Sequence, residues 1–388
     1  MVAGPSETTT HAEFGVRTTA LTVAAAFPSA IAGKTILITG VNIKGLGFAT
    51  AQAFASQKAA LLILAGRTPA KLQESADTLA REYPGTKFRI LELDLSSQRG
   101  ARAAAATLNG WTDLPAIDIL VNNAGIMNIP TRQLNEDGIE RHFATNHVGH
   151  FLFTNLIMGK LIAAAQKPGA GKGATRVINV SSMGANFSPI RYSDINWEKA
   201  NETIPLVEQP DYLRFSQMLG IDQDVIKADS FISMGAYGQS KTANVLFSLG
   251  LNERLYNKYG ILSLGLHPGS IITELGREMD PEVWRQRTEK FKKGGMVFKN
   301  QEEGTSTTLV AAVDPALTLP TKRPLASEAD LAKMGRELKG EDGEWEGRGV
   351  FLSDCQIFED AKVWFTSWSQ GEKLWAKSEE LVGEKFAY

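Results

Sequence analysis

The fold of this chain is decided by residues 35–47, which read TILITGVNIKGLG. The first five residues are mainly apolar, as in a strand that is covered on both faces. A glycine-rich turn follows and leads into residues 48–57, for which we predict a helix. Glycines at such a turn let the backbone approach a pyrophosphate group at the helix N-terminus. The stretch therefore predicts a dinucleotide-binding unit of strand, turn and helix.

The alternation of strand and helix continues along the chain. Further strands are predicted at 61–65, 88–93, 117–121, 176–180, 262–266 and 349–352, and helices at 69–81, 101–108, 143–153, 237–249 and 305–313. Such alternation implies a parallel sheet with helices on both faces. The predicted fold class is α/β, with a Rossmann-type doubly wound parallel sheet in one domain, residues 33–388. An N-terminal arm and short helix, residues 1–32, would precede this domain.

Two segments are longer than the sheet connections require. The first is an insertion at about 186–233, which mixes polar residues with Phe187, Tyr192, Trp197, Tyr212 and Phe215. Long segments of this kind often form lids or pocket walls, although a surface flap or a subunit contact is the alternative. The second, at about 274–300, is predicted to cover the substrate. In the C-terminal extension, the tryptophans are expected to pack in the core: Trp364, Trp368 and Trp375.

Composition narrows the class of protein. The chain has 388 residues and a formal net charge of -2, which gives no support for nucleic-acid binding. Its single cysteine, Cys355, cannot form an internal disulfide and suits a reducing compartment. The apolar run 20–32 is too short, and too interrupted by Pro28, to span a bilayer. We predict a soluble, cytoplasmic protein without a transmembrane segment.

Proton-transfer chemistry is indicated by residues 233–244, which read SMGAYGQSKTAN. Tyr237 and Lys241 are four residues apart, so on a helix their side chains lie on one face. A phenol is a poor acid–base catalyst at neutral pH, and a nearby ammonium group lowers its pKa. We therefore expect Lys241 to lower the pKa of Tyr237. Taken alone, the same spacing is more often an ordinary tyrosine beside a solvated lysine.

Residues at the ends of strands indicate the cofactor. Arg67 lies twenty residues after Gly47, where an NAD-binding fold presents a carboxylate and an NADP-binding fold an arginine. Lys44 adds a positive charge in the glycine loop. Asp94 and residues 122–125 follow two further strands, at the edge where such sheets bind ligands. These residues predict NADP(H).

Two other kinds of site are disfavoured. His142, His147 and His150 lie close together in the sequence, but no cluster of carboxylates or cysteines joins them, so no metal site is predicted. Ser182 follows the strand at 176–180 without the G-x-S-x-G turn of a hydrolase nucleophile. At that edge of the sheet its hydroxyl can instead bond to a substrate oxygen.

These motifs, in this order, resemble those of the short-chain dehydrogenase/reductase family over roughly residues 33–385. The matches are Thr39-Gly40 with Gly45 and Gly47, Asp94, Asn122-Asn123-Ala124-Gly125, Asn146, Ser182, Tyr237 with Lys241, and Pro268-Gly269 with Thr273. The sequences NHVGHF at 146–151 and SKTANVLF at 240–247 are similar to the retinol-dehydrogenase-like subgroup. One departure is the glycine loop, which has four residues between Gly40 and Gly45 where the usual pattern has three.

The resemblance implies a role for each matching residue. Tyr237 would exchange a proton with the substrate oxygen, and Lys241 would lower its pKa and bind the nicotinamide ribose. Ser182 would polarise the carbonyl group, and Asn146 would hold a water that links Lys241 to solvent. Lys44 and Arg67 would bind the 2′-phosphate of NADP. The other cofactor contacts would come from Gly40, Asn42, Gly45, Leu46, Gly47, Asp94, Leu95, Asn123, Ala124, Gly125, Pro268, Gly269, Ile271 and Thr273, together with Tyr237 and Lys241 themselves.

The resemblance thus implies an NADP(H)-dependent oxidoreductase that interconverts an alcohol and a ketone or aldehyde. The aromatic insertion suggests a bulky, fairly apolar small molecule as the substrate. The alternative is an epimerase, lyase or rearrangement enzyme of the same fold, which uses the cofactor transiently or not at all. A dinucleotide sensor is disfavoured, because it would not need a catalytic tyrosine. Relatives often form homo-oligomers through the helices around Asn146 and Tyr237, so the resemblance also allows a homo-oligomer.

Overall fold

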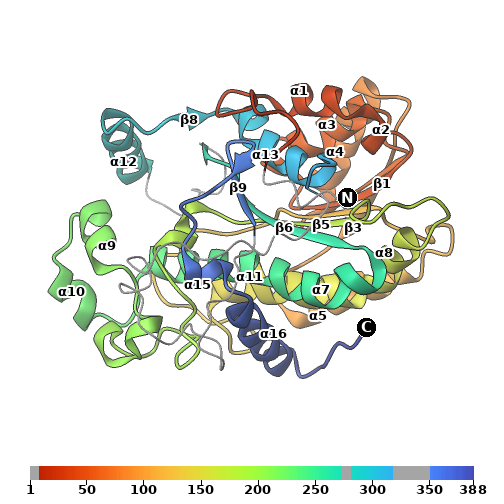
Figure 1. The fold of residues 1–388 in the computed structure, drawn as a ribbon. Helices are drawn as coiled ribbons and strands as arrows, with labels where there is room; N and C mark the ends of the chain where they lie inside the picture. Colours follow the sequence, from red (N-terminus) through yellow and green to blue (C-terminus); the bar gives the residue numbers. More distant parts are fainter. Residues whose placement is uncertain (1–7, 272–280, 318–349) are drawn as a thin grey trace, which may run out of the picture.

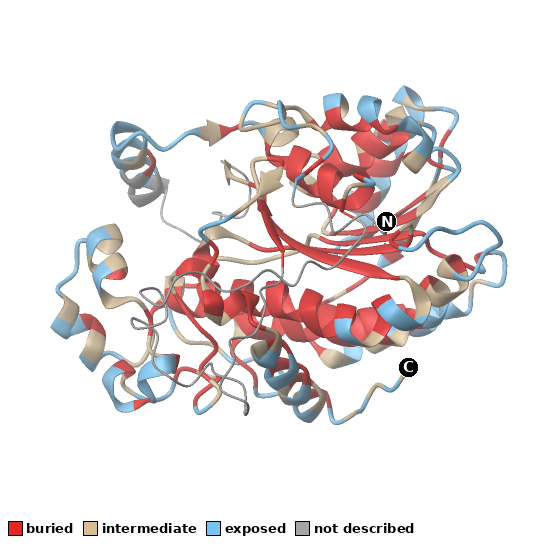
Figure 2. Ribbon diagram, viewed as in Figure 1, coloured by how far each residue is buried: buried red, intermediate tan, exposed pale blue. Residues whose placement is uncertain are grey.

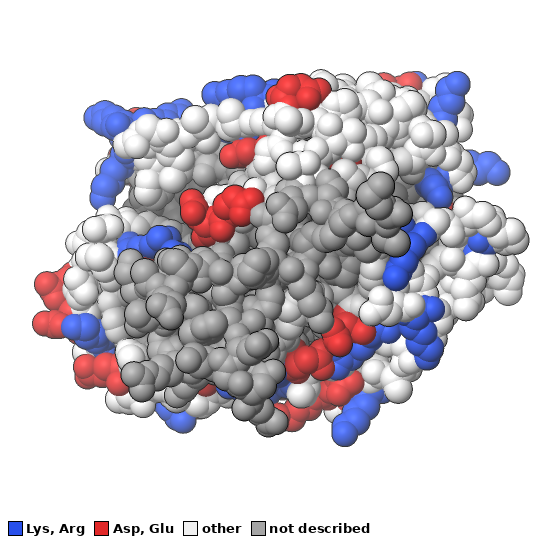
Figure 3. Space-filling model, viewed as in Figure 1, with Lys and Arg blue, Asp and Glu red and all other residues white. Residues whose placement is uncertain are grey.

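The computed structural model describes residues 8–271, 281–317 and 350–388. Thr273, the first part of the predicted covering segment and the polar 326–347 region lie outside the described residues. The described parts form a central sheet with a layer of helices on each face (Figure 1). On the face of the molecule in Figure 3, the basic side chains (blue) and the acidic side chains (red) of the described residues are interspersed.

The central sheet has eight strands in the order β10-β9-β6-β5-β4-β1-β2-β3. They are β1 Thr35–Thr39, β2 Leu61–Gly66, β3 Lys87–Glu92, β4 Ile119–Asn122, β5 Arg176–Val180, β6 Leu262–His267, β9 Phe351–Ser353 and β10 Gln356–Ile357. All neighbouring pairs are parallel except β9 and β10. The α/β class and the doubly wound parallel sheet are thus confirmed. A separate two-stranded sheet pairs β7 Ser270–Ile271 with β8 Phe298–Lys299.

Two groups of helices bury the faces of the sheet in two separate apolar clusters. One face carries α1 Ala20–Ala26, α2 Pro28–Ile31, α3 Leu46–Ser56, α4 Pro69–Glu82 and α13 Gln301–Val313. The other carries α5 Gln98–Asn109, α7 Gly149–Leu156, α8 Met158–Ala165, α11 Ser233–Tyr259 and α16 Trp368–Val382. Figure 2 shows that α11 and the strands in the middle of the sheet are mostly buried, whereas the edge strands β3 and β10 are largely half-buried or exposed. Residues beside the sheet's C-terminal edge are therefore held by a rigid core.

The insertion is a small helical subassembly rather than an extended flap. It contains two 3₁₀ turns, Asn201–Thr203 and Leu206–Glu208, and the helices α9 Tyr212–Leu219 and α10 Gln223–Ala228. Trp197 and Phe215 are fully buried in its own apolar cluster. The covering segment contains α12 Pro281–Lys293, which lies with α9 and α10 at one end of the molecule (Figure 1). The last helix before α16 is the short α15 Val363–Thr366.

The N-terminal arm is docked from residue 8 onward. The Thr10 hydroxyl and amide both bond to the carboxylate of Asp314, and the Thr9 hydroxyl bonds to Gln356. In α1, Val23 and Ala24 are fully buried, and this helix packs against the helices α3 and α13. The partners of these polar residues, Asp314 and Gln356, come from the far end of the chain, so the docking of the arm leaves no local pattern in the sequence.

Among the described residues, no single helix is long and apolar enough to cross a membrane. The segments 141–156 and 158–165 are long and apolar enough only when they are taken together, and their axes are bent by 58° relative to each other.

Between the short helix α6 Arg141–Phe143 and α7, the backbone forms a π-helix, Ala144–Val148, where we had predicted a continuous α-helix. A π-helical turn leaves room for one extra residue, and such turns are frequent at functional sites.

Close packing at Gly149 gives a stability prediction. A Cβ atom at Gly149 would lie 2.3 Å from the backbone oxygen of Leu95, whereas a Cβ atom at Gly159 would meet nothing within 4 Å. Gly149→Ala is therefore expected to destabilise the protein by about 1–3 kcal/mol through overpacking. Gly159→Ala, in the exposed part of α8, should instead stabilise it by about 1 kcal/mol. Urea denaturation measures both, and a stabilising effect of Gly149→Ala would contradict the observed packing.

Candidate active site

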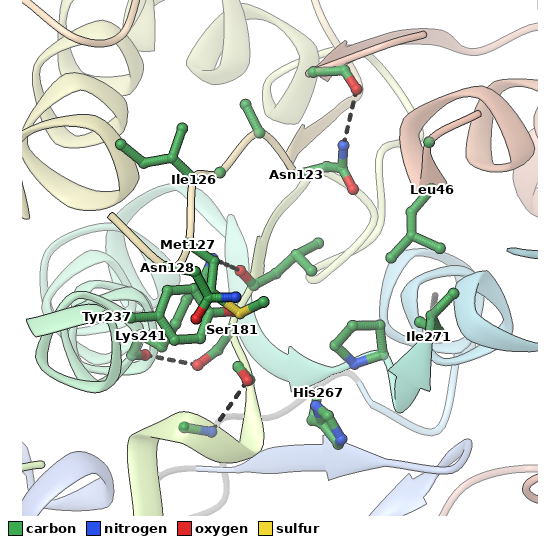
Figure 4. A pocket seen from close by; sticks show the side chains of 18 of the residues that line it. Leu46, Asn123, Ile126, Met127, Asn128, Ser181, Tyr237, Lys241, His267 and Ile271 are labelled. Carbon is green, nitrogen blue, oxygen red and sulfur yellow. Dashed lines mark hydrogen bonds between the residues drawn. The ribbon is translucent and has the colours of Figure 1, made fainter. Parts of the chain in front are cut away.

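A large pocket lies beyond the C-terminal ends of the central strands. Its volume is about 1120 Å³, and its lining includes the ends of β1 to β6, the start of α3 and parts of α9 and α12. Pockets for one drug-sized ligand have about 300–1000 Å³, so this one has room for a cofactor and a substrate together. Figure 4 shows the side chains that face it.

The glycine loop fits a pyrophosphate group at the start of α3. The helix begins behind Gly45, and no side chain of the described residues caps it, so its first amides remain available for an anion. Gly40 has a φ of 74°, which favours glycine. The Oδ1 atom of Asn42 is buried without a hydrogen-bond partner in the described parts of the chain, and Asn42 lines the pocket.

Thr39 ties the glycine loop to the loop behind β4. Its hydroxyl oxygen accepts hydrogen bonds from the amides of Asn123 and Ala124, both at 3.0 Å. The side-chain Nδ2 atom of Asn123 in turn donates to the Thr39 carbonyl oxygen at 2.8 Å. His150 lies on the other side of the same hydroxyl, at 2.9 Å. The two walls of the dinucleotide half of the pocket are therefore fixed relative to each other.

Three candidate catalytic side chains meet at the floor of the pocket. Tyr237 and Lys241 lie one turn apart on α11, and the Lys241 Nζ atom is 5.8 Å from the centre of the tyrosine ring. Ser182 follows β5 and lines the same pocket. A Cβ atom placed on Gly184 would lie 3.2 Å from the Tyr237 ring and 3.5 Å from the Ser182 hydroxyl. The three side chains that were predicted to act together are thus brought together.

Burial sets the protonation of this group. The pKa of Tyr237 is raised to about 12, because burial disfavours the phenolate, although a hydrogen bond with Ser182 acts in the opposite direction. Burial also lowers the pKa of Lys241 to about 7. We had expected Lys241 to lower the pKa of Tyr237; in this structure burial raises that pKa instead, and the opposing cause is the hydrogen bond with Ser182. Tyr237 therefore holds its proton at neutral pH.

Lys241 is held by the core of the protein. Its Nζ donates to the carbonyl of Val180 at 2.9 Å and to Asn244 Oδ1 at 3.1 Å. Asn244 Nδ2 donates to the backbone oxygen of Asn146 at 2.7 Å. Asn244, one turn beyond Lys241, was missed by the sequence analysis because an amide in a helix gives no signal of its tertiary partners.

Asn146 sits in the π-helical turn and is fully buried. Its Oδ1 accepts from the amide of Ile126 at 2.8 Å, and its Nδ2 donates to the carbonyl of Ile126 and to the Ser240 hydroxyl. The side chain therefore fixes the loop behind β4 to α11. The backbone oxygen of Asn146 is linked to Lys241 through the side chain of Asn244.

Of the two cations predicted to bind the 2′-phosphate, Arg67 and Lys44, only Arg67 lines the pocket. Arg67 lines the pocket together with Thr68 and Lys71, at the start of α4. Lys44 is exposed and lies outside the lining. Lys71 was missed because its position on the first turn of α4 relative to the pocket cannot be read from spacing alone.

Most other predicted cofactor residues line the pocket. They are Gly40, Asn42, Gly45, Leu46, Arg67, Asp94, Leu95, Asn123, Ala124, Gly125, Tyr237, Lys241, Pro268, Gly269 and Ile271. Gly47 is buried behind the lining, where a Cβ atom would lie 2.7 Å from the Gly40 carbonyl oxygen. His267 was not predicted; it lines the pocket, its Nδ1 accepts from the Met183 amide at 3.1 Å, and burial lowers its pKa to about 3.

The opposite half of the pocket is lined by phenylalanine and methionine side chains together with several polar ones. The insertion contributes Phe187, Arg214, Gln217 and Met218, and the covering segment contributes Thr288, Lys290, Phe291, Gly294, Met296 and Phe298. The insertion therefore does form a pocket wall, as one of our two interpretations held. Its other aromatic residues serve its own packing or, in the case of Tyr192, contact α16 through a hydrogen bond to Gln370.

The histidines near the site have separate protein partners. His142 Nδ1 pairs with Glu140 at 2.8 Å, His147 Nε2 with Ser378 at 2.7 Å, and His150 with Thr39. Within the described ranges, no three His, Cys, Asp or Glu side chains are grouped as metal ligands.

Comparisons with known proteins agree with this arrangement. A family model described as short chain dehydrogenase matches residues 34–193. Oxidoreductase fscI of Fusarium equiseti is 36% identical over 66% of this chain and 94% of its own length. Human retinol dehydrogenase 13 is 34% identical over 91% of this chain and 86% of its own length. The crystal structure of an uncharacterised protein from Mycobacterium paratuberculosis is 26% identical, with a TM-score of 0.59 over 94% of this chain and 98% of that one.

Proposed function

The chain belongs to the short-chain dehydrogenase/reductase family of oxidoreductases, with retinol dehydrogenases among its relatives, and on this premise we propose that it interconverts an alcohol and a ketone or aldehyde with NADP(H). The observation that carries the proposal is the meeting of Ser182, Tyr237 and Lys241 on the floor of the pocket. They lie between the glycine cradle and an apolar wall, where a cofactor and a substrate would meet.

The three side chains divide the work of carbonyl reduction. A bound nicotinamide would supply the hydride. Tyr237 keeps its proton at neutral pH because burial raises its pKa to about 12, so it serves as the general acid that protonates the substrate oxygen. The Ser182 hydroxyl bonds to the same oxygen and stabilises the charge that develops there. Lys241, fixed by Val180 and Asn244, has its Nζ atom 5.8 Å from the centre of the phenol ring. Burial lowers its pKa to about 7, so it is partly protonated at neutral pH, and this charged form stabilises the phenolate that remains when Tyr237 has given up its proton.

Preference for NADP(H) is supported by the cations at the adenosine end of the pocket. Arg67 and Lys71 line the pocket next to the start of α4, and Lys44 does not. A 2′-phosphate carries negative charge and accepts charge-assisted hydrogen bonds, for which an arginine is well suited. We therefore assign the phosphate to Arg67 and Lys71 and not to Lys44.

The substrate is proposed to be bulky and mainly apolar. Five methionines, Met127, Met183, Met218, Met234 and Met296, line the pocket with three phenylalanines. Methionine side chains are flexible and polarisable, so such a wall adapts to ligands of irregular shape.

Titration with NADPH and with NADH, followed by nicotinamide fluorescence, tests the cofactor assignment. Arg67→Ala and Lys71→Ala should each weaken NADPH binding about tenfold or more, because each removes a charge-assisted bond. NADH binding should change less than about twofold. Lys44→Ala removes an equal charge outside the pocket and is the matched control. Equal affinity of the wild type for both cofactors, or an effect of Lys44→Ala as large as that of Lys71→Ala, would overturn the assignment.

A further inference from the structure

Asn128 is a buried amide in the pocket wall to which the proposed mechanism gives no role. It lies between β4 and α6, is 6% exposed and lines the pocket. Its Nδ2 atom is buried and has no hydrogen-bond partner among the described residues. A buried amide donor without a partner loses its bonds to water and gains none in return. Such a donor in a ligand pocket points to a ligand acceptor.

The backbone on both sides of Asn128 is fixed. Two residues before it, Ile126 exchanges two hydrogen bonds with the side chain of Asn146. One residue after it, the Ile129 amide donates to His142 Nε2 at 3.3 Å. His142 is itself held by Glu140. The position of Asn128 in the pocket wall is therefore fixed by the backbone on both sides of it.

Asn128 is close to the catalytic floor. The ring of His142, which holds the next residue, packs edge-on to the ring of Tyr237 with 6.3 Å between the centres. Figure 4 shows the Asn128 amide in the part of the pocket that contains Tyr237, Lys241 and Ser181. A molecule whose carbonyl oxygen reaches Tyr237 would therefore place its adjoining atoms near Asn128.

Two other orphaned polar atoms belong to lining residues in the described ranges, and they carry less information. Asn42 Oδ1 is in the glycine loop, on the cofactor side. The Thr145 hydroxyl can rotate to suit its surroundings. Asn128 differs because its amide is planar, held at its backbone and adjacent to the apolar, methionine-rich wall. In that wall a single fixed donor gives the orientation and specificity that apolar contacts lack.

We propose that Asn128 is a substrate-binding residue that donates a hydrogen bond from Nδ2 to a second oxygen of the substrate. The substrate class is thereby narrowed to bulky, mainly apolar carbonyl compounds that carry another oxygen acceptor near the reacting group. This inference rests on the proposed function for the position of the reacting carbonyl.

Binding of two matched compounds tests the inference. The probes are a dimethylindanone and the dimethylindanedione that differs from it by one added carbonyl group. Their affinities are measured by calorimetry in the presence of NADP⁺, and NADPH consumption is followed separately. The wild type should bind the diketone about tenfold more tightly, the value of one well-placed hydrogen bond.

The variants are chosen to fold like the wild type. Asn128 has a φ of 62°, which glycine adopts freely and Asp tolerates. Asn128→Gly removes the amide, and Asn128→Asp keeps its shape but replaces the donor. Both should abolish the preference for the diketone while changing the affinity for the monoketone less than about threefold. Ile129→Val, at the next residue in the chain and outside the pocket lining, should keep the preference.

The outcomes separate the two proposals. A diketone preference that both variants abolish supports the role of Asn128 even if no NADPH is consumed, in which case the proposed reaction fails. The role of Asn128 is overturned if the variants lose the same affinity for both compounds, if the wild type shows no preference, or if the diketone does not bind. If NADPH is nevertheless consumed in any of these three cases, the proposed reaction stands without a role for Asn128.

Discussion

Tyr237→Phe is expected to lower turnover by a hundred- to ten-thousand-fold, the usual contribution of a positioned general acid. The ring is buried against Gly184 and His142, and phenylalanine keeps both contacts. Only the hydroxyl is lost, so NADPH affinity should stay within about twofold. Steady-state NADPH consumption with a bulky ketone, together with a fluorescence titration of NADPH, measures the two effects.

The matched control for Tyr237→Phe is Tyr256→Phe on the same helix. Tyr256 is also buried, and its hydroxyl has no partner among the described residues. Removing that hydroxyl should leave turnover unchanged. Full activity in Tyr237→Phe would exclude the proposed acid and would favour a protein that only senses the dinucleotide. Turnover of substrate without net NADPH consumption would instead favour the epimerase or lyase alternative.

Arg191→Met is expected to destabilise the insertion by about 3–5 kcal/mol, the cost of breaking a buried ion pair on one side. Arg191 is fully buried, bonds to Asp194 and Asn201, and stacks over the Trp197 ring at 4.1 Å. Methionine keeps much of the volume but leaves the buried Asp194 carboxylate without its cation. Urea denaturation and the rate of proteolytic cleavage within the insertion measure the loss.

Arg89→Met is the matched control for Arg191→Met. Arg89 stacks over Trp111 at 3.5 Å and pairs with Asp113 at 3.0 Å, so the chemistry is the same, but the pair is exposed to solvent. Its loss should cost less than about 1 kcal/mol. Similar small effects of both substitutions on stability and on cleavage would show that burial does not strengthen the Arg191 cluster.

Most of the sheet could be predicted from sequence because its strands carry their own signal. Strands covered on both faces are continuous apolar runs, and β1 and β5 begin and end at the predicted residues. The residues at their carboxyl ends then follow from topology, which is why Ser182 and the loop behind β4 were found. The predicted boundaries of β4 and the last strand were wrong by one or two residues, and the short strand β10 was not predicted.

What the sequence did not give depends on contacts between distant parts of the chain. A π-helical turn at 144–148 differs from an α-helix in hydrogen-bond register and not in residue pattern. Lys44 and Lys71 are both lysines near the phosphate-binding region, and only the direction of the local backbone decides which one faces the pocket. Asn128 has significance only because its buried Nδ2 atom finds no hydrogen-bond partner in the described parts of the chain. The protonation of Tyr237 follows from burial, which spacing does not report.

The origin of the pocket walls has a consequence for how such a protein can evolve. The floor and the dinucleotide half belong to the central sheet, α3 and α11, whereas much of the apolar wall belongs to α9, α12 and their neighbouring residues. Those two helices project from connections between core elements. Selection can therefore remodel them, residue by residue or as whole segments, while the redox machinery is inherited unchanged. New substrates can be acquired in this way without the loss of catalysis that changes in the core would bring.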